Sequence, residues 1–167
     1  NTSQYTNNTS QYNLVLGIPY KGLNNSGSVY VVNENFPEGD YLEYQDTSNK
    51  YFGKAVSLSS DGTVLAVGVS NNNDKGYVEV YRYKSKSWAQ IGDDIYGENV
   101  GDNFGSSVAL NAEGTILAVG SPGDDDSGDV CVYNYNGSNW IQMGKNIIGE
   151  ISGELNKTSL VLSHDGT

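Results

Sequence analysis

Short apolar runs rich in Val, Leu and Tyr alternate along the chain with turns rich in Gly, Asn, Asp and Ser. No stretch has the 3.6-residue period of an amphipathic helix. Val and Tyr favour strands, and Gly supplies the positive φ that tight turns require. The pattern therefore predicts an all-β protein built from short strands.

The pattern repeats at an interval of about 52 residues, and residues 52–103 align with residues 104–155 without a gap at about 22 identical positions. Partial copies flank them, because residues 14–17 match 65–68 and residues 159–167 match 55–63. The repeated structural positions are a Phe-Gly pair, a turn glycine, a strand glycine and a tryptophan: Phe52, Gly53, Gly62, Gly68 and Trp88, and then Phe104, Gly105, Gly114, Gly120 and Trp140.

Each repeat is expected to contain four antiparallel strands, which in the second copy span 105–110, 115–120, 128–135 and 140 to 148. The second of these strands is nearly all apolar, which implies burial on both faces. A propeller blade has this property, because each sheet packs between two neighbouring sheets, whereas a sandwich sheet would alternate more strictly. We therefore predict β-propeller blades, about three repeats in all.

The repeats divide the chain into a polar N-terminal segment (1–12), a partial blade with the second to fourth strands (13–51), two full blades (52–103 and 104–155) and the first strand and turn of a further blade (156–167). One blade is thus split between the two ends. Propellers usually have about 4 to 8 blades. Three arrangements would complete the split blade. The preferred one is a segment of a longer propeller; the others are two copies that share about six blades, and a compact ring of three.

The Phe-Gly pairs and the Leu-Ala-Val-Gly runs resemble the FG-GAP repeat, the family that forms the propeller at the head of integrin α chains and of many secreted adhesion-type proteins. The resemblance covers roughly residues 13 to 167. The Gly-Ala-Pro element of the family is imperfect here, reading Gly17-Ile18-Pro19, Gly68-Val69-Ser70 and Gly120-Ser121-Pro122. WD-repeat blades, which have a similar Asp-Gly turn, are the alternative, but the longer period and the Phe-Gly pairs favour FG-GAP.

The calcium hairpin of that family is not expected in this chain. Calcium-binding FG-GAP blades carry Asp-x-Asp-x-Asp-Gly in the first hairpin, whereas each hairpin here has one carboxylate, and Ca²⁺ takes about six to eight oxygen ligands. No cofactor is predicted. Calcium in the most acidic loop is the alternative to a solvated loop, and its ligands would be Asp124, Asp125, Asp126 and Asp129.

Several other side chains invite a functional interpretation, but each has a simpler structural one. Asp102 is expected to cap backbone N–H groups at the turn between blades, and Trp88 and Trp140 to pack at the start of the outer strands rather than to stack on a ligand. His164 is expected to be exposed in a turn, and Cys131 lies in a predicted third strand. No catalytic constellation can be assembled from these residues, so we predict that the chain is not an enzyme.

The formal net charge of -11 excludes nucleic acid and anionic membranes as favoured partners, and it favours cations or basic protein surfaces. No apolar run is long enough to span a membrane. The glycosylation sequons at Asn24 and Asn136 fall in predicted loops and favour an extracellular or surface location. The expected function is recognition of a protein or glycan ligand by loops on a rigid scaffold. The alternative is a structural subunit of a filament, cell-surface coat or virion, whose neighbours complete the split blade.

Overall fold

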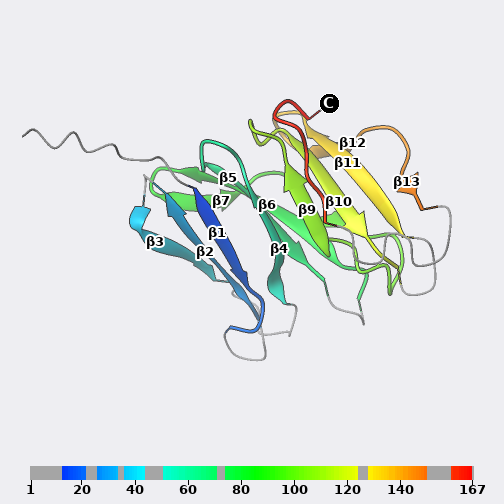
Figure 1. The fold of residues 1–167 in the computed structure, drawn as a ribbon, viewed down its shortest axis with the longest axis horizontal. Helices are drawn as coiled ribbons and strands as arrows, with labels where there is room; N and C mark the ends of the chain where they lie inside the picture. The colour runs from blue at the N-terminus through cyan, green and yellow to red at the C-terminus, as the bar shows by residue number, and fades with distance from the viewer. Residues whose placement is uncertain are drawn as a thin grey trace, which may run out of the picture.

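The computed structural model describes residues 13–21, 26–33, 36–43, 51–70, 74–123, 128–149 and 159–166. These residues contain strands and turns and no helix, so the predicted all-β class is confirmed for them. No helix that could cross a membrane occurs in them. The strands form three antiparallel sheets (Figure 1).

The first sheet consists of β1 (Leu14–Ile18), β2 (Ser28–Asn33) and β3 (Phe36–Glu43), in that order. The second has β4 (Phe52–Leu58), β5 (Val64–Val69), β6 (Tyr77–Lys84) and β7 (Ser87–Gln90), with β8 (Ile95–Tyr96) paired to β6. The third repeats this plan with β9 (Ser107–Leu110), β10 (Ile116–Ser121), β11 (Asp129–Tyr135), β12 (Trp140–Gln142) and β13 (Ile147–Ile148), the last paired to β11.

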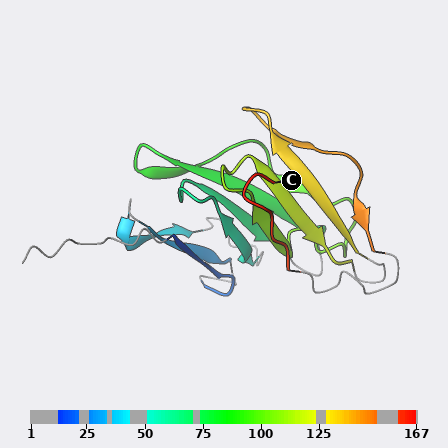
Figure 2. The ribbon, with the colours of Figure 1, turned by 45° about the horizontal axis from the view of Figure 1, so that its top comes forward.

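The three sheets follow one another in chain order, so that the first and the third lie at opposite ends of the molecule (Figures 1 and 2). β4 packs against β1, and β9 packs against β4. The arrangement matches that of successive propeller blades. The described residues form an open series of sheets and do not close into a compact three-bladed ring.

The outer part of each full sheet differs from the sequence prediction. A single fourth strand was expected from residue 140 to 148, but the structure has two short strands there, β12 and β13. Gly144 lies between them at a φ of 68°, in the left-handed region that interrupts an extended strand. Beyond this interruption the chain continues antiparallel to β11, and β13 pairs with the start of β11, where Asp129 lies opposite Ile148.

The second strand of each full sheet is buried on both faces, as its apolar sequence predicted. All six residues of β5 are buried. Leu65 and Val67 belong to the core between the first and second sheets, whereas Val64 and Ala66 belong to the core between the second and third. Burial of one such side chain contributes roughly 1.5–3 kcal/mol, so these two cores stabilise the stacking of the sheets.

Main-chain hydrogen bonds also tie each sheet to the next. The N–H of Phe104 donates to the carbonyl oxygen of Lys75 at 3.0 Å, and the N–H of Phe52 donates to that of Ser26 at 3.1 Å. The aromatic rings of both Phe-Gly pairs are buried. The Phe-Gly pair thus anchors the start of each sheet to the sheet before it.

The turn between the first and second strands of the second sheet is hydrogen-bonded to the equivalent turn of the third sheet, and that turn is bonded to the C-terminal turn. The N–H of Ser60 donates to the carbonyl oxygen of Ala112 at 2.9 Å, and the N–H of Ala112 donates to that of His164 at 3.0 Å. Residues 159–163 are not assigned to any strand, although Leu160 and Leu162 pack on the outer face of the third sheet. The C-terminal segment therefore lies where the first strand and turn of a following sheet would lie.

Candidate functional site

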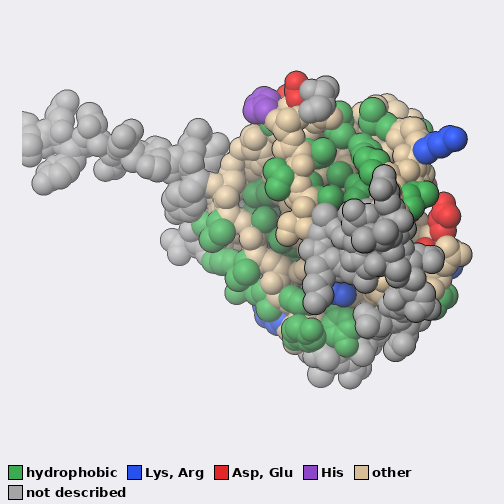
Figure 3. Space-filling model, turned by 45° about the vertical axis from the view of Figure 1, so that its right-hand side comes forward, with side chains coloured by type: hydrophobic (Ala, Val, Ile, Leu, Met, Phe, Trp, Pro, Cys, Tyr) green, Lys and Arg blue, Asp and Glu red, His purple; other side chains and the backbone are tan. Residues whose placement is uncertain are grey.

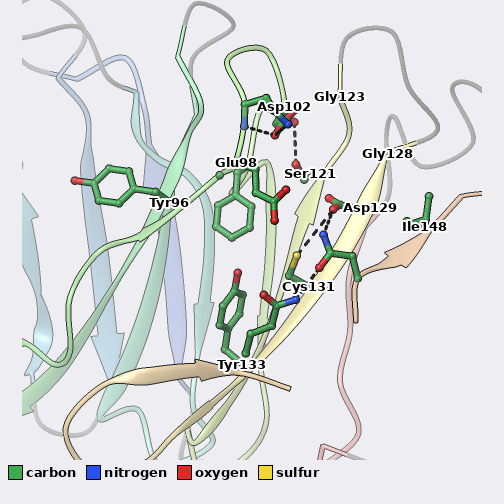
Figure 4. A pocket seen from close by; sticks show the side chains of 15 residues that line it. Tyr96, Glu98, Asp102, Ser121, Gly123, Gly128, Asp129, Cys131, Tyr133 and Ile148 are labelled. Atoms are coloured by element: carbon green, nitrogen blue, oxygen red, sulfur yellow. Dashed lines mark hydrogen bonds between the residues drawn. The ribbon is translucent and has the colours of Figure 1, made fainter. Parts of the chain in front are cut away.

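A pocket of about 330 Å³ opens between the outer parts of the second and third sheets (Figure 4). One wall comes from β8 and the loop that follows it, and the other from β10, β11 and the β12–β13 connection. The lining residues include Glu98, Asn99, Asp102 and Phe104 on the first wall, and Ser121, Asp129, Cys131, Tyr133, Gln142 and Asn146 on the second.

The pocket lies where the third sheet departs from the repeat. Asp129 occupies the position of Tyr77, whose ring is 4% exposed in the core beside the first sheet. Ser121 likewise occupies the position of the buried Val69. Smaller polar side chains thus replace larger apolar ones, and they leave a hollow in the third sheet where the second is filled.

The remaining repeat positions shape the apolar side of the pocket. Phe104 and Tyr133 meet edge to face with ring centroids 6.4 Å apart, as Phe52 and Tyr81 do at 6.2 Å one repeat earlier. Such pairs are worth roughly 0.5–1.5 kcal/mol beyond burial. The pocket therefore has a rigid aromatic wall that belongs to the scaffold.

A chain of side-chain hydrogen bonds holds the Asp129 carboxylate in place. Asn146 Nδ2 donates to Asp129 Oδ2 at 2.5 Å, and Gln142 Nε2 donates to Asn146 Oδ1 at 2.6 Å. The second link repeats in the preceding sheet, where Gln90 Nε2 donates to Asp94 Oδ1 at 2.6 Å. The repeat thus supplies the supporting pair, and only the carboxylate is new.

Asp102 organises the opposite wall. Its Oδ2 accepts hydrogen bonds from the main-chain N–H of Asn99 at 2.7 Å and from Asn99 Nδ2 at 3.3 Å. Its carbonyl oxygen accepts from Ser121 Oγ at 3.2 Å and from the N–H of Gly123 at 2.9 Å. The predicted capping role of Asp102 is confirmed, and the residue also joins the two walls.

The pocket is electrostatically negative. Burial raises the pKa of Asp129, the hydrogen bonds from Asn146 and Ser121 partly offset this, and the carboxylates of Asp102 and Glu98 raise it further. Among the described residues, no Lys or Arg lines the pocket; the nearby Lys75 donates through Nζ to the carbonyl oxygen of Glu98 at 2.7 Å. A positively charged group in the pocket would relieve this repulsion.

Two further titratable groups of the pocket, Cys131 and Tyr133, have raised pKa values that favour their neutral forms. Burial, with the adjacent Asp129 charge, raises the pKa of the Cys131 thiol to about 11. Burial chiefly raises the pKa of the Tyr133 hydroxyl as well. Cys131 is therefore a weak nucleophile at neutral pH.

Of the acidic loop singled out in the sequence, only Asp129 lies among the described residues, and it faces the pocket. Asp124, Asp125 and Asp126 lie outside them. Within the described ranges, no three His, Cys, Asp or Glu side chains are grouped closely enough to hold a metal ion. Calcium binding by this loop therefore stays the untested alternative to a solvated acidic loop.

The other singled-out residues take the expected structural places. Trp140 begins β12, is 6% exposed, and donates from Nε1 to the carbonyl oxygen of Ile91 at 3.1 Å. Trp88 lies in β7 with its ring 5.3 Å from that of Tyr83. The side chain of His164 is 81% exposed. Asn136 lies in an exposed turn, and Asn24 lies outside the described residues.

Sequence reasoning did not find the pocket itself. A usable signal was present, since polar residues stand at two buried positions of the repeat, in the places of Val69 and Tyr77. Which surfaces these positions face depends on how neighbouring sheets stack.

Comparison with protein families finds the FG-GAP repeat, which matches residues 97–133. That segment runs from the β8 end of the pocket to Tyr133 and includes the Phe104-Gly105 pair. No curated protein matches the chain significantly in sequence.

Among solved structures, the fold is similar to that of the intramolecular trans-sialidase from Ruminococcus gnavus, whose structure was determined in complex with oseltamivir carboxylate. The two share 12% sequence identity at a TM-score of 0.53, over 92% of this chain and 34% of the enzyme. This chain therefore spans about a third of the enzyme's length. The likeness shows the fold.

Proposed function

The chain carries an FG-GAP repeat at residues 97–133, and from this premise we propose that it is a non-catalytic recognition module of the β-propeller type that acts outside the cell or on a surface. The acidic pocket between the second and third sheets is its ligand site. The observation that supports this most strongly is the replacement of an apolar repeat position by a carboxylate, which places Asp129 in the third sheet where the second sheet has Tyr77.

The ligand group that fits this pocket best is a basic side chain of a protein partner. Glu98, Asp102 and Asp129 supply three carboxylates, and the rings of Phe104 and Tyr133 supply an apolar wall. A guanidinium group suits both the carboxylates and the apolar wall, because it donates several hydrogen bonds to carboxylates and stacks on aromatic faces. The net charge of -11 would also steer a basic partner toward the molecule.

Binding without catalysis is supported by the chemistry of the described residues. His164 lies in the exposed hairpin turn at the C-terminal end and does not line the pocket. The raised pKa of Cys131 keeps its thiol protonated. The pocket thus offers acceptors and a rigid surface, and no activated nucleophile lines it.

An extracellular or surface location is supported by Asn136, which lies in an exposed turn within an Asn-Gly-Ser sequon. Its Oδ1 accepts hydrogen bonds from the N–H groups of Ser138 and Asn139, both at 2.9 Å, so the amide nitrogen stays available to a glycan. Expression through a secretory route, followed by mass analysis of the peptide that contains Asn136, tests this location.

The ligand class is tested by NMR titration of the isotope-labelled chain with N-acetyl-arginine amide, N-acetyl-lysine amide, neutral methyl glycosides and calcium chloride in separate experiments. We expect arginine amide to shift the resonances of Glu98, Asp129 and Cys131 most. Asp129→Asn should weaken this binding about tenfold, since a hydrogen bond to a charged group is worth roughly 1.5–3 kcal/mol.

Asp40→Asn is the matched control, because Asp40 lies in β3 of the first sheet and does not line the pocket. It should leave arginine binding unchanged. If only the glycosides or only calcium produced shifts, the proposal of a basic ligand would be wrong, and the pocket would bind a sugar or a metal ion instead. The chain is also incubated with a fluorogenic sialoside. Release of the fluorescent product by the wild-type chain but not by Asp129→Asn would contradict a non-catalytic function.

A further inference from the structure

The hairpin between β6 and β7 concentrates positive charge in an acidic molecule. Arg82, Lys84 and Lys86 are three of the nine basic residues of the chain, and they fall within five consecutive positions. The equivalent positions of the next repeat hold two asparagines and a serine. On the face of the molecule drawn in Figure 3, Lys and Arg side chains are few and scattered. The basic hairpin therefore departs both from the repeat and from the net charge of -11.

The charges of this hairpin are not compensated by nearby acids. Within the described residues, no carboxylate forms an ion pair with Arg82, Lys84 or Lys86. Arg82 lies instead over the ring of Tyr135 in the third sheet, with its Cζ 5.6 Å from the ring centroid. The side chains of Lys84 and Lys86 are exposed. The hairpin thus presents two free ammonium groups next to a guanidinium that the third sheet holds in place.

Lys86 occupies a turn position that backbone geometry would assign to glycine. Lys84 pairs with Ser87, so Ser85 and Lys86 form a two-residue turn. Their φ angles are 55° and 66°, in the left-handed region where such turns favour Asn-Gly. The next repeat has Gly137 at the position of Ser85. Strain at residues other than glycine is typical of functional positions, so this turn indicates a role for the charge at its tip.

The pocket between the second and third sheets has the opposite charge. Glu98, Asp102 and Asp129 line it, and no Lys or Arg of the described residues does. Burial and the carboxylates of Asp102 and Glu98 raise the pKa of Asp129, so a cation from outside would relieve their repulsion. A lysine ammonium has three donors and no acceptor, which suits a site lined by carboxylate oxygens. The hairpin and the pocket are therefore complementary in charge.

The hairpin and the pocket lie at opposite ends of the second sheet. β6 begins at Tyr77, which pairs with Tyr96 immediately before the loop that lines the pocket. It ends at Lys84, where the hairpin turn begins. At about 3.3 Å per residue, the two ends of this 8-residue strand are about 23 Å apart. The hairpin therefore cannot reach the pocket of its own molecule, whereas the hairpin of a copy stacked along the strand direction can.

We propose that the basic hairpin of one copy of this chain binds in the acidic pocket of another copy, with Lys84 and Lys86 as the inserted charges. This names the partner of the proposed ligand site and rests on that function. The contact joins two different surfaces, so each pair keeps one unoccupied pocket and one unoccupied hairpin, and further copies can add head to tail. At about 0.15 M salt, charges more than about 8 Å apart are largely screened, so the contacting groups outweigh the repulsion between two acidic molecules.

Self-association of the purified chain tests the proposal. The chain is produced in bacteria, so that Asn136 in the neighbouring hairpin carries no glycan. Sedimentation velocity and diffusion NMR at physiological salt should show an average mass that rises above 18.0 kDa between micromolar and millimolar concentration. Lys84→Gln combined with Lys86→Gln should weaken this association at least about tenfold, because hydrogen bonds to charged groups are lost. Asp129→Asn should weaken it to a similar extent.

A mixture of the two variants tests the head-to-tail geometry. The double lysine variant keeps its pocket, and Asp129→Asn keeps its hairpin. Each variant alone should remain monomeric where the wild-type chain associates. Mixed in equal amounts, they should form pairs containing one copy of each, and these pairs should not grow, because the remaining hairpin and the remaining pocket are both defective. An interface made of the same surface on both copies would not be restored by mixing.

Three control variants separate charge from hairpin structure. Lys84→Arg combined with Lys86→Arg should retain association, because both charges remain. Lys21→Gln combined with Lys145→Gln changes the net charge equally at sites outside the hairpin and the pocket, and it should also retain association. Lys86→Gly should weaken association without lowering the thermal unfolding midpoint, because glycine adopts the positive φ more readily. A misfolded hairpin then cannot account for the loss.

The arginine-amide titration is run on the same samples. Arginine binding at Asp129 without self-association up to millimolar concentration would overturn this proposal and leave the ligand site intact, whereas loss of both would overturn both. Association that survives the double lysine substitution or Asp129→Asn would place the interface elsewhere. An acetylated peptide of alternating glutamate and threonine is added in a separate arm. If it shifted the resonances of Lys84 and Lys86 while the copies stayed apart, the hairpin would serve an acidic partner and the proposal would be wrong.

Discussion

Gly68 and Gly105 touch across the boundary between the second and third sheets, so closely that a Cβ at Gly68 would lie 2.0 Å from the main-chain oxygen of Gly105. The same contact joins Gly17 to Gly53, where the distance would be 1.9 Å. The second-strand glycine of one repeat and the Phe-Gly glycine of the next are therefore two halves of one contact. This contact sets how closely successive sheets approach each other.

Gly68→Ala is expected to destabilise the protein by at least about 2 kcal/mol, because the new methyl group meets rigid backbone and the sheets must move apart. The matched control is Gly144→Ala, where no atom lies within 4 Å of the new Cβ and the φ of 68° alone carries a cost of about 1 kcal/mol. Urea unfolding of both variants measures the difference. Equal losses would show that the contact does not control sheet packing.

Asp129→Asn is expected to stabilise the folded chain at neutral pH. The pKa of Asp129 is raised in the fold, chiefly by burial, so its ionisation opposes folding as the pH rises above the carboxyl's unfolded value. Below that value the wild-type carboxyl is protonated, and the two proteins should have the same stability. Thermal unfolding between pH 3 and pH 8 tests this. A variant that is less stable at neutral pH would mean that the Asn146 hydrogen bond requires the charge.

Asp61 should have the opposite pH dependence. Burial raises the pKa of this carboxyl, but hydrogen bonds from Ser59 and from the N–H and hydroxyl of Thr63 outweigh burial and lower it. Its contribution is present above the unfolded pKa and is lost as the pH falls through the lower folded value. Asp61→Ala should therefore cost about 1 kcal/mol at pH 7 and less at pH 3.

Glu113→Ala is the natural comparison for Asp61→Ala, because the two acids occupy equivalent turn positions. In the third sheet Asn111 Oδ1 accepts the turn's N–H groups from Thr115 and Ile116, at 2.8 and 2.9 Å. Loss of the exposed Glu113 should therefore cost little. If both substitutions cost the same at pH 7, the assignment of the stabilising hydrogen bonds to Asp61 is wrong.

Cys131 should resist thiol reagents in the folded protein. It is 5% exposed, and its pKa of about 11 leaves almost no thiolate at pH 8. Labelling with Ellman's reagent should be slow in buffer and complete within minutes in concentrated urea. Fast labelling of the folded chain would show that the pocket opens to admit the reagent.

The repeat made most of the fold predictable from the sequence. Turn glycines such as Gly62 and Gly114, and the apolar second strand that follows each of them, predicted strand order and burial on both faces, because local turn chemistry and short-range apolar pattern carry that information. The division of the fourth strand was missed, because Gly144, at a positive φ, interrupts what reads as one outer strand.

The sequence by itself determined that this protein is built of repeated antiparallel β units, that Phe104-Gly105 begins such a unit, and that Asp102 caps a turn, because each of these depends on neighbours along the chain. Only the tertiary structure decided that Asp129 and Asp102 face one pocket, and that Gly68 touches Gly105. Those relationships join separate sheets, and the distance between sheets is set by packing on both faces at once. The apolar pattern of a single strand therefore cannot predict the distance between two sheets.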